Sequence, residues 1–489
     1  MNKGPMFGYH AEPTKSWLIV KEELLEEANQ VFAGAGVNIT SQGKKHLGAV
    51  IGHPEYKHEF VEKLVNEWTQ QIKSLAEIAA FEPQAAYTAF TSCIRHKYTF
   101  YLRTIPNISE LLQPLEDAIR SKLIPALTEG RNVTDDERLL LSLPARLGGM
   151  GIISPMRMSD MENEFSNDAT SVLTSAIINQ QKHLHQGLSE ISKEAKSKIS
   201  AKRKKHQSEV LTDLKSRMTD DQIRSNEVCC EAGASNWLTS LPINDKGFSL
   251  SKHEFWDAIN LRYGWPISRL SSKCACGANF DVGQALSCKK GGFIAQRHNE
   301  LRDMTADLLA EVCHDVCVEP PLNQLSGESF SHKTANTSDE ARLDISARSV
   351  WARNQRSFFY IRVFDPKAQR FRGQSLQQTY VTNEKEKKRV YNERVLQVEN
   401  GTFTPLVFSV TGGMGQECKV FFKRVSLLIA DKRNEKLSAV SSWIRTRTSF
   451  ALLRSSLMCL RGSRHRYFRS VISEVDMELD ISESIVKPI

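Results

Sequence analysis

The chain has 489 residues, 40% of them hydrophobic and 25% charged, a composition typical of a globular protein with room for roughly two to four domains. It contains no stretch of about 18 uncharged apolar residues and no signal-peptide core, so we expect no membrane helix and an intracellular protein of the nucleus or cytoplasm. Lysine and arginine outnumber aspartate and glutamate by 65 to 57, giving a formal net charge of +8.

The basic excess is concentrated in three short runs, at residues 194–206, 385–389 and 461–470. Any one run is compatible with a solvated helix face or a tail. Three such runs in one chain favour a polyanionic partner, which means nucleic acid.

The first half of the chain is mainly helical by the spacing of its apolar residues, which recur three and four positions apart after a short extended region. The expected elements are a strand within 7–21, a short amphipathic helix at 22–32, two extended pieces within 36–52, helices from 56 to 128, a loop at 143–152 and a polar helical arm at 158–240.

Three of the ten cysteines lie close together, in the pattern C-x-C-x11-C formed by Cys274, Cys276 and Cys288. Closely spaced thiolates are how a chain supplies several zinc ligands from one turn, so the pattern predicts a metal site rather than a disulfide framework. A tetrahedral site needs a fourth ligand, and His298, at the start of the next helix, is the candidate. The alternative is that these are reduced cysteines in a small core.

The region after the cysteines changes to a mixed pattern, with apolar residues at helical spacing in some segments and alternating in others. The expected order is α-β-β-β-α-β, with a helix at 297–315, strands at 316–320, 341–349 and 357–364, a helix at 375–398 and a strand at 404–412.

Asp344 lies in the second of these expected strands, between Leu and Ile. A carboxylate there is what a metal-dependent nuclease needs to hold a divalent cation near the scissile phosphate. The second acid should lie two residues before a basic residue on the next strand, where the chain has Tyr360 and Arg362. Arg362 is suited to a phosphate, but Tyr360 cannot replace a carboxylate on a metal. The alternative for Asp344 is a salt bridge to Arg342 or Arg348.

Residues 271–299 resemble the zinc knuckle and the Arg-His-Asn motif that precede the restriction-like endonuclease of non-LTR retrotransposons. The family pattern is Cys-Cys-His-Cys, and the histidine of that pattern falls at about Gln284. The resemblance therefore implies a weakened zinc site unless His298 compensates. Arg297, His298 and Asn299 match the second motif and are implied contacts to nucleic acid.

The α-β-β-β-α-β order with Asp344 resembles the PD-(D/E)xK nuclease core. In this resemblance Tyr360 stands at the position of the second acid and Arg362 at that of the lysine. Lys388 and Tyr391, on the following helix, resemble a downstream lysine-tyrosine element of the same domain. Two departures at two sites imply a nuclease that has lost activity, with magnesium relevant only if activity remains.

The N-terminal part resembles the reverse transcriptase of the same elements. The segment PTKSWLIVK is similar to a palm segment, with Lys15 at the position of its lysine, and HLGAVIG (46–52) is similar to the primer grip. LPARLGGMGI (143–152) is similar to a segment after the thumb. The Asp-Asp pairs at 135–136 and 220–221 follow threonine and predict helix N-termini rather than a polymerase metal site.

The fold expected from these observations is a multidomain α+β protein: a partial, helix-rich palm and thumb, a zinc knuckle and a PD-(D/E)xK-like nuclease fold. The expected domains are a palm remnant (1–56), a thumb-like domain (57–157), a helical arm (158–265), a zinc-knuckle-like segment (266–300), a nuclease-like domain (301–430) and a basic C-terminal tail (431–489).

The function that these residues favour is binding of DNA, and of element RNA, by a retrotransposon-type fragment that is inactive as a polymerase and impaired as a nuclease. Phosphate contacts are assigned to Arg297, Arg362, Lys387, Lys388 and Arg389. One alternative is a live magnesium-dependent nuclease that recruits another acid, such as Glu319 or Glu300. The other is a non-catalytic helical scaffold with incidental cysteines.

Overall fold

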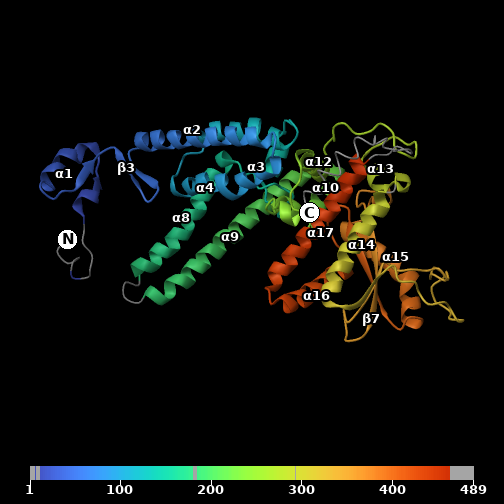
Figure 1. Cartoon of the computed structure of the whole chain (residues 1–489). Coiled ribbons are helices and arrows are strands. Elements are labelled where there is room, and N and C mark those ends of the chain that lie inside the picture. Colours follow the sequence, from blue (N-terminus) through green and yellow to red (C-terminus); the bar gives the residue numbers. More distant parts are fainter. Residues whose placement is uncertain (1–5, 7–11, 180–183, 292, 463–489) are drawn as a thin grey trace, which may run out of the picture. The chain divides into compact units, whose positions relative to one another are not determined.

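The structure, a computed structural model, describes residue 6 and residues 12–179, 184–291 and 293–462 (Figure 1). The chain is a mixed α+β protein, 61% helical, with small sheets, which confirms the expected class at this level. No helix within the described ranges is long and apolar enough to cross a membrane. The chain divides into two compact units: residues 1–143 with 151–214, and residues 144–150 with 215–489.

The first unit begins with short strands and continues as helices. Strand β1 (Trp17–Ile19) pairs in parallel with β2 (Asn38–Thr40), and β3 (Gly43–His46) pairs antiparallel with β4 (Ala49–Gly52). The strand expected within 7–21 is β1, and the range 36–52 contains three strands where the sequence predicts two extended pieces. The helices are α1 (Leu25–Val31), α2 (Pro54–Ala79), α3 (Pro83–Ala89), α4 (Arg95–Thr104), α5 (Gln113–Ala118), α6 (Ile124–Leu127), α7 (Asp135–Ser142), α8 (Pro155–Asn179) and α9 (Leu184–Arg217).

Helix α2 organises the core of the first unit because its apolar residues form one stripe. Val61, Val65, Trp68, Ile72 and Leu75 are spaced four, three, four and three residues apart, and all are buried. This spacing places them on one face of an α-helix. The face packs against α3, α5 and α6, so the helical pattern predicted from residue 56 onward is confirmed.

The first part of the expected helical arm packs within the first unit, through a buried carboxylate. Glu162 of α8 is 4% exposed and accepts hydrogen bonds from Arg103 of α4, at 3.0 Å, and from Arg203 of α9, at 2.7 Å and 2.9 Å. A buried charge is stable when it is paired and hydrogen-bonded. The arm expected at 158–265 is therefore divided, since residues from 215 onward belong to the second unit.

The second unit contains the α-β-β-β-α-β order predicted from the sequence, followed by two helices. The sheet order is β5-β6-β7-β8; the first two pairings are antiparallel and β7 runs parallel to β8. Its elements are α10 (Asp220–Cys229), α11 (Asn236–Thr239), α12 (Lys252–Tyr263), α13 (Val282–Ser287), α14 (Phe293–Val312), β5 (His314–Val318), β6 (Ile345–Arg348), β7 (Arg356–Phe364), α15 (Leu376–Gln397), β8 (Thr402–Ser409), α16 (Gln416–Arg433) and α17 (Leu437–Arg461).

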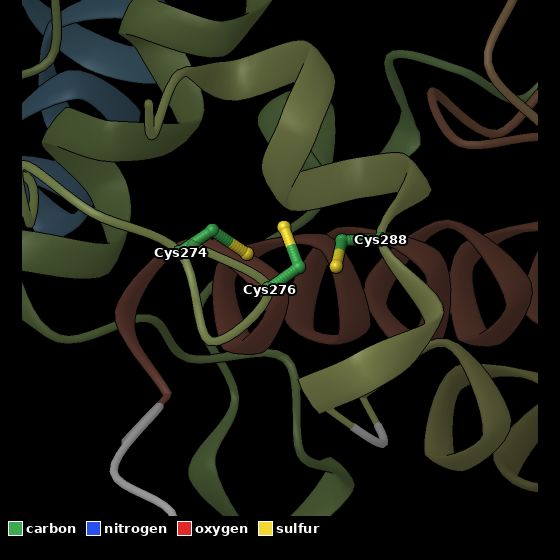
Figure 2. Close-up of side chains that lie close together, drawn as sticks. All are labelled: Cys274, Cys276 and Cys288. Atoms are coloured by element: carbon green, nitrogen blue, oxygen red, sulfur yellow. The ribbon is translucent and has the colours of Figure 1, made fainter. Parts of the chain in front are cut away.

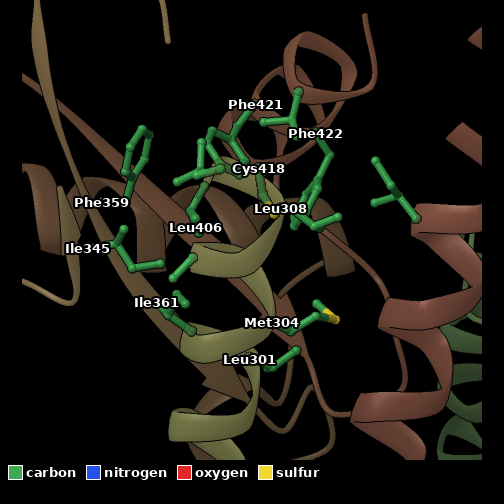
Figure 3. Packing of buried hydrophobic residues seen from close by; sticks show 14 of the residues in the cluster. Leu301, Met304, Leu308, Ile345, Phe359, Ile361, Leu406, Cys418, Phe421 and Phe422 are labelled. Atoms are coloured by element: carbon green, nitrogen blue, oxygen red, sulfur yellow. The ribbon is translucent and has the colours of Figure 1, made fainter. Parts of the chain in front are cut away.

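Strand β7 is buried on both faces. Phe359 and Ile361 belong to the main core, where they meet residues of α14, β8 and α16 such as Leu308 and Phe421 (Figure 3). Phe358 belongs to a second cluster, which includes Val395 of α15. Successive side chains of a strand point to opposite faces, so the two clusters lie on the two sides of the sheet.

Helix α17 occupies residues that were expected to begin a basic tail. Its buried residues include Val440, Ile444, Phe450 and Leu452, and it packs against α14 and α16. The sequence suggested a tail because the basic run at 461–470 dominates the end of the chain. Most of that run lies outside the described residues.

A buried arginine fixes the long connection between β5 and β6. Arg394 of α15 is fully buried, and its guanidinium donates to the backbone carbonyls of Asn323, Asn336 and Ser338 at 2.8–2.9 Å. The connection carries few regular elements of its own. Its path past α15 therefore depends on these three charge-assisted hydrogen bonds.

The loop after α10 is tied to the carboxyl end of β8 through Glu231. Its carboxylate accepts from the Tyr380 hydroxyl at 3.0 Å and from the Ser409 hydroxyl at 3.5 Å. A side chain at Gly413 would lie 2.0 Å from the same carboxylate oxygen, so glycine is required there. Burial raises the pKa of Glu231 to about 7, although these hydrogen bonds oppose the shift.

Glu231 should make the stability of the second unit fall as pH rises. The folded form holds its proton up to about pH 7 and the unfolded form only to about 4.5, so stability is full below 4.5 and is lost through about 7. The difference between the folded and unfolded pKa values corresponds to a contribution of about 3 kcal/mol to the free energy of unfolding. Urea denaturation at pH 5 and pH 8 should show this loss in the wild type and a much smaller one in Glu231→Gln. The exposed control Glu340→Gln should behave as the wild type; equal pH dependence in all three proteins would contradict the assignment.

Candidate functional site

The three cysteines of the predicted metal site lie together. Cys274 and Cys276 lie on a tight turn, in which the Gly277 N–H donates to the Cys274 carbonyl at 2.8 Å and Gly277 has a φ of +90°. Cys288 follows the last residue of α13. The three sulfur atoms lie within 4.8 Å of one another (Figure 2). Residues that are fourteen positions apart in the sequence therefore form one thiol cluster.

The cluster could hold a metal ion. Cys274 is buried, which by itself raises the pKa of its thiol, but hydrogen bonds from the Cys276 backbone and from the Cys288 and Gln284 side chains lower that pKa to about 6. Burial raises the pKa of the Cys288 thiol. Thiolates are the form of cysteine that binds metals.

The fourth position is not taken by His298. Among the residues that the structure describes, the ligand group contains the three cysteines and no histidine or carboxylate. The His298 side chain instead forms a hydrogen bond with Asp344, with 3.1 Å between His298 Nε2 and Asp344 Oδ2. The residue beside the sulfurs is Gln284, whose Nε2 donates to the Cys276 sulfur at 3.0 Å.

Asp344 is a backbone cap at the edge of the sheet. It lies immediately before β6, rather than inside a strand, and its Oδ2 accepts from the Ile361 N–H at 2.5 Å. Ile345, the first residue of β6, pairs with Phe359 of β7. Beyond this pair, the Asp344 carboxylate supplies the acceptor that the Ile361 N–H would otherwise lack. The expected alternative was a salt bridge of Asp344 to Arg342 or Arg348. Among the described residues the ion-pair partner of Asp344 is His298, and Arg348 pairs with Asp315 at 3.0 Å.

The contact between His298 and Asp344 joins the Arg-His-Asn segment of α14 to the four-stranded sheet. Burial lowers the pKa of His298, but the hydrogen bond to Asp344 and the charge of that carboxylate outweigh it, so the net direction is upward. The carboxylate therefore has the His298 imidazole within hydrogen-bonding distance. No sequence pattern predicts this contact, because 46 residues separate the two positions.

Tyr360 fills the place where a second acid was expected. Its ring stacks on Tyr391 with 5.4 Å between centroids, and the Lys387 ammonium lies 4.3 Å from the Tyr360 ring centre. Burial first, and then the charge of Asp344, raise the pKa of Tyr360 to about 12. In place of a second carboxylate, the site therefore has the stacked rings of Tyr360 and Tyr391, with the Lys387 ammonium over the Tyr360 ring.

Neither acid considered as a substitute lies free beside Asp344. Glu319 pairs with Arg302, and Glu300 accepts a hydrogen bond from Ser455 of α17. Each carboxylate already has a partner within the fold.

The other predicted site residues separate into buried and exposed groups. Arg297 is 3% exposed and donates to the Leu286 carbonyl at the end of α13, so its guanidinium supports the cysteine segment rather than reaching a phosphate. Lys388 forms a 2.6 Å ion pair with Glu417 of α16. Arg362 Nε is buried and has no hydrogen-bond partner.

The remaining predicted contacts lie on different elements, and all except Lys387 are exposed. Arg389 and Asn299 are exposed, on α15 and α14. Lys387 is half-buried against Tyr360. Lys15 is exposed in the first unit.

Comparison with protein-family models and with curated proteins finds no match to this chain.

Loss of the Asp344 carboxylate should destabilise the second unit independently of any activity. In Asp344→Ala the Ile361 N–H, on a residue 1% exposed, loses its acceptor, which costs about 1–3 kcal/mol. Asp344→Asn keeps a carbonyl oxygen and should cost less. Urea denaturation midpoints of the wild type and both variants test this order, and equal midpoints for Ala and Asn would show that the cap contributes nothing.

Proposed function

We propose that the chain is a nucleic-acid-binding protein of the non-LTR retrotransposon type, with a zinc-knuckle-like centre and a PD-(D/E)xK-like domain that is impaired as a nuclease. In this proposal the first unit corresponds to palm and thumb elements without polymerase activity. The observation that carries the proposal is the environment of Asp344. This single carboxylate is hydrogen-bonded to His298, and its charge acts on Tyr360 at the position expected to hold a second acid.

The chemistry of phosphodiester cleavage explains why this arrangement should be weak. A divalent cation supplies Lewis-acid activation of the phosphate and of the attacking water when it is bound. Magnesium is held in such sites by carboxylates and water in octahedral geometry. This chain offers Asp344 alone, already engaged by Ile361 and His298, and Tyr360 is a neutral phenol at neutral pH.

Support for nucleic-acid binding comes from the basic surface of α15. Lys385, Lys388 and Arg389, together with His332, line a hollow of about 210 Å³. Lys385 and Arg389 are exposed, while Lys388 is held by Glu417. Exposed cations gathered on one helix contact phosphates without reading sequence, which gives salt-dependent affinity.

Restoring the missing acid should restore nicking. Supercoiled plasmid with magnesium or manganese should remain intact with the wild type and with the control Tyr360→Phe, and should be nicked by Tyr360→Asp. The double variant Tyr360→Asp with Asp344→Asn should again be inactive, because a site of this kind needs both carboxylates.

Two results would contradict the nuclease assignment. Nicking by the wild type that Asp344→Asn abolishes would mean that the protein is active and that another acid completes the site. Absence of nicking by a Tyr360→Asp protein whose circular dichroism matches the wild type would remove Tyr360 from the catalytic position.

Binding should depend on the exposed cations of α15. Lys385→Ala with Arg389→Ala should weaken binding to duplex DNA and reduce the slope of log affinity against log salt by about 2, roughly 0.9 for each lost phosphate contact. The control pair Lys423→Ala and Lys436→Ala removes two exposed charges from other elements of the same unit. Fluorescence anisotropy at several salt concentrations measures both slopes, and identical slopes would place the interface elsewhere.

A further inference from the structure

We propose that Gln284 is the fourth ligand of the cysteine centre and binds the metal through its side-chain oxygen Oε1. The inference rests on the proposed zinc centre and answers which residue completes it. The expected ligand, His298, is engaged with Asp344 and lies outside the sulfur group.

The position of Gln284 is fixed by the start of α13. Asp281 caps this helix, and its carboxylate accepts from the Gln284 backbone N–H at 2.7 Å. The side chain then reaches the turn that carries the first two cysteines, where Nε2 lies 3.0 Å from the Cys276 sulfur. Gln284 is half-buried, as Cys276 and Cys288 are. The first turn of α13 thus brings the Gln284 amide to the sulfur of Cys276.

The amide group offers both of the chemistries that the centre needs. Half a turn about the last side-chain bond exchanges Nε2 and Oε1 at nearly the same positions. Without a metal, the NH₂ group donates to the Cys276 sulfur. With a metal, the carbonyl oxygen becomes the donor atom, since oxygen ligands bind zinc at about 2.0–2.2 Å alongside thiolates.

A three-sulfur, one-oxygen centre has a distinct expected behaviour. A neutral amide oxygen is a weaker zinc ligand than imidazole nitrogen, because zinc is a borderline-soft ion. The wild type should therefore bind zinc less tightly than Gln284→His and more tightly than Gln284→Leu, which keeps the size of the side chain but has no donor atom. We expect each step to be roughly tenfold in dissociation constant.

The experiment measures metal binding by the full chain, not activity. Zinc affinity is obtained by competition with a chromophoric chelator, and cobalt(II) is used as the spectroscopic probe. Tetrahedral cobalt with three thiolates gives strong visible absorption, whose position should differ between the wild type, Gln284→His and Gln284→Leu. Cys276→Ser removes one of the three thiolates and should lose the corresponding part of the charge-transfer absorption from sulfur to cobalt. Circular dichroism of each variant confirms that it is folded.

The outcomes separate the inference from the centre itself. Equal affinities and equal cobalt spectra for the wild type and Gln284→Leu would overturn the role of Gln284 and leave a three-cysteine centre. Binding by Gln284→His alone would likewise show that glutamine does not bind the metal, while it places the centre correctly. No metal binding by any folded variant would overturn both proposals.

Discussion

The second unit depends on the burial of β7 on both faces. A strand with one buried face needs other elements to pack on that face alone. β7 needs them on both faces, because Phe359 and Ile361 lie in the main core and Phe358 packs in the second cluster with residues of α15. Its residues therefore alternate between two separate hydrophobic clusters. A shift of one residue in its pairing would exchange the two sets, which fixes the position of every side chain along it, including Tyr360 and Arg362.

The candidate nuclease site follows from this constraint. The pairing of β6 with β7 stops at Ile345 and Phe359, so the Ile361 N–H has no backbone acceptor on β6. The side chain of Asp344, the residue before β6, supplies the acceptor. The same carboxylate is the candidate metal ligand, so stability and chemistry compete for one side chain. Gln284 and Tyr360 have one property in common. Gln284 still touches Cys276, and Tyr360 still lies in the field of Asp344, so each substituted residue keeps its place at its site.

The sequence predicts the features that depend on local periodicity. The strands of the second unit and its helices α14 and α15 follow from alternating and helical spacing, and the thiol cluster follows from C-x-C-x11-C, whereas helix α17 was not predicted. The contacts that depend on packing between distant elements do not follow. His298 was expected at the cysteines because it is near them in sequence, but α14 carries it to the sheet. Arg297 was expected at a phosphate because it is charged, yet it is buried against Leu286.

Arg394 has a consequence for how the sequence of this domain can change over evolutionary time. Its guanidinium contacts the connection between β5 and β6 through main-chain carbonyls, so these hydrogen bonds depend on the course of the backbone and not on the identity of the side chains. Substitutions in that connection leave these three bonds intact as long as the backbone keeps its course. These three bonds therefore tolerate a change of side chain along the connection, whereas a change at Arg394 would remove all of them at once.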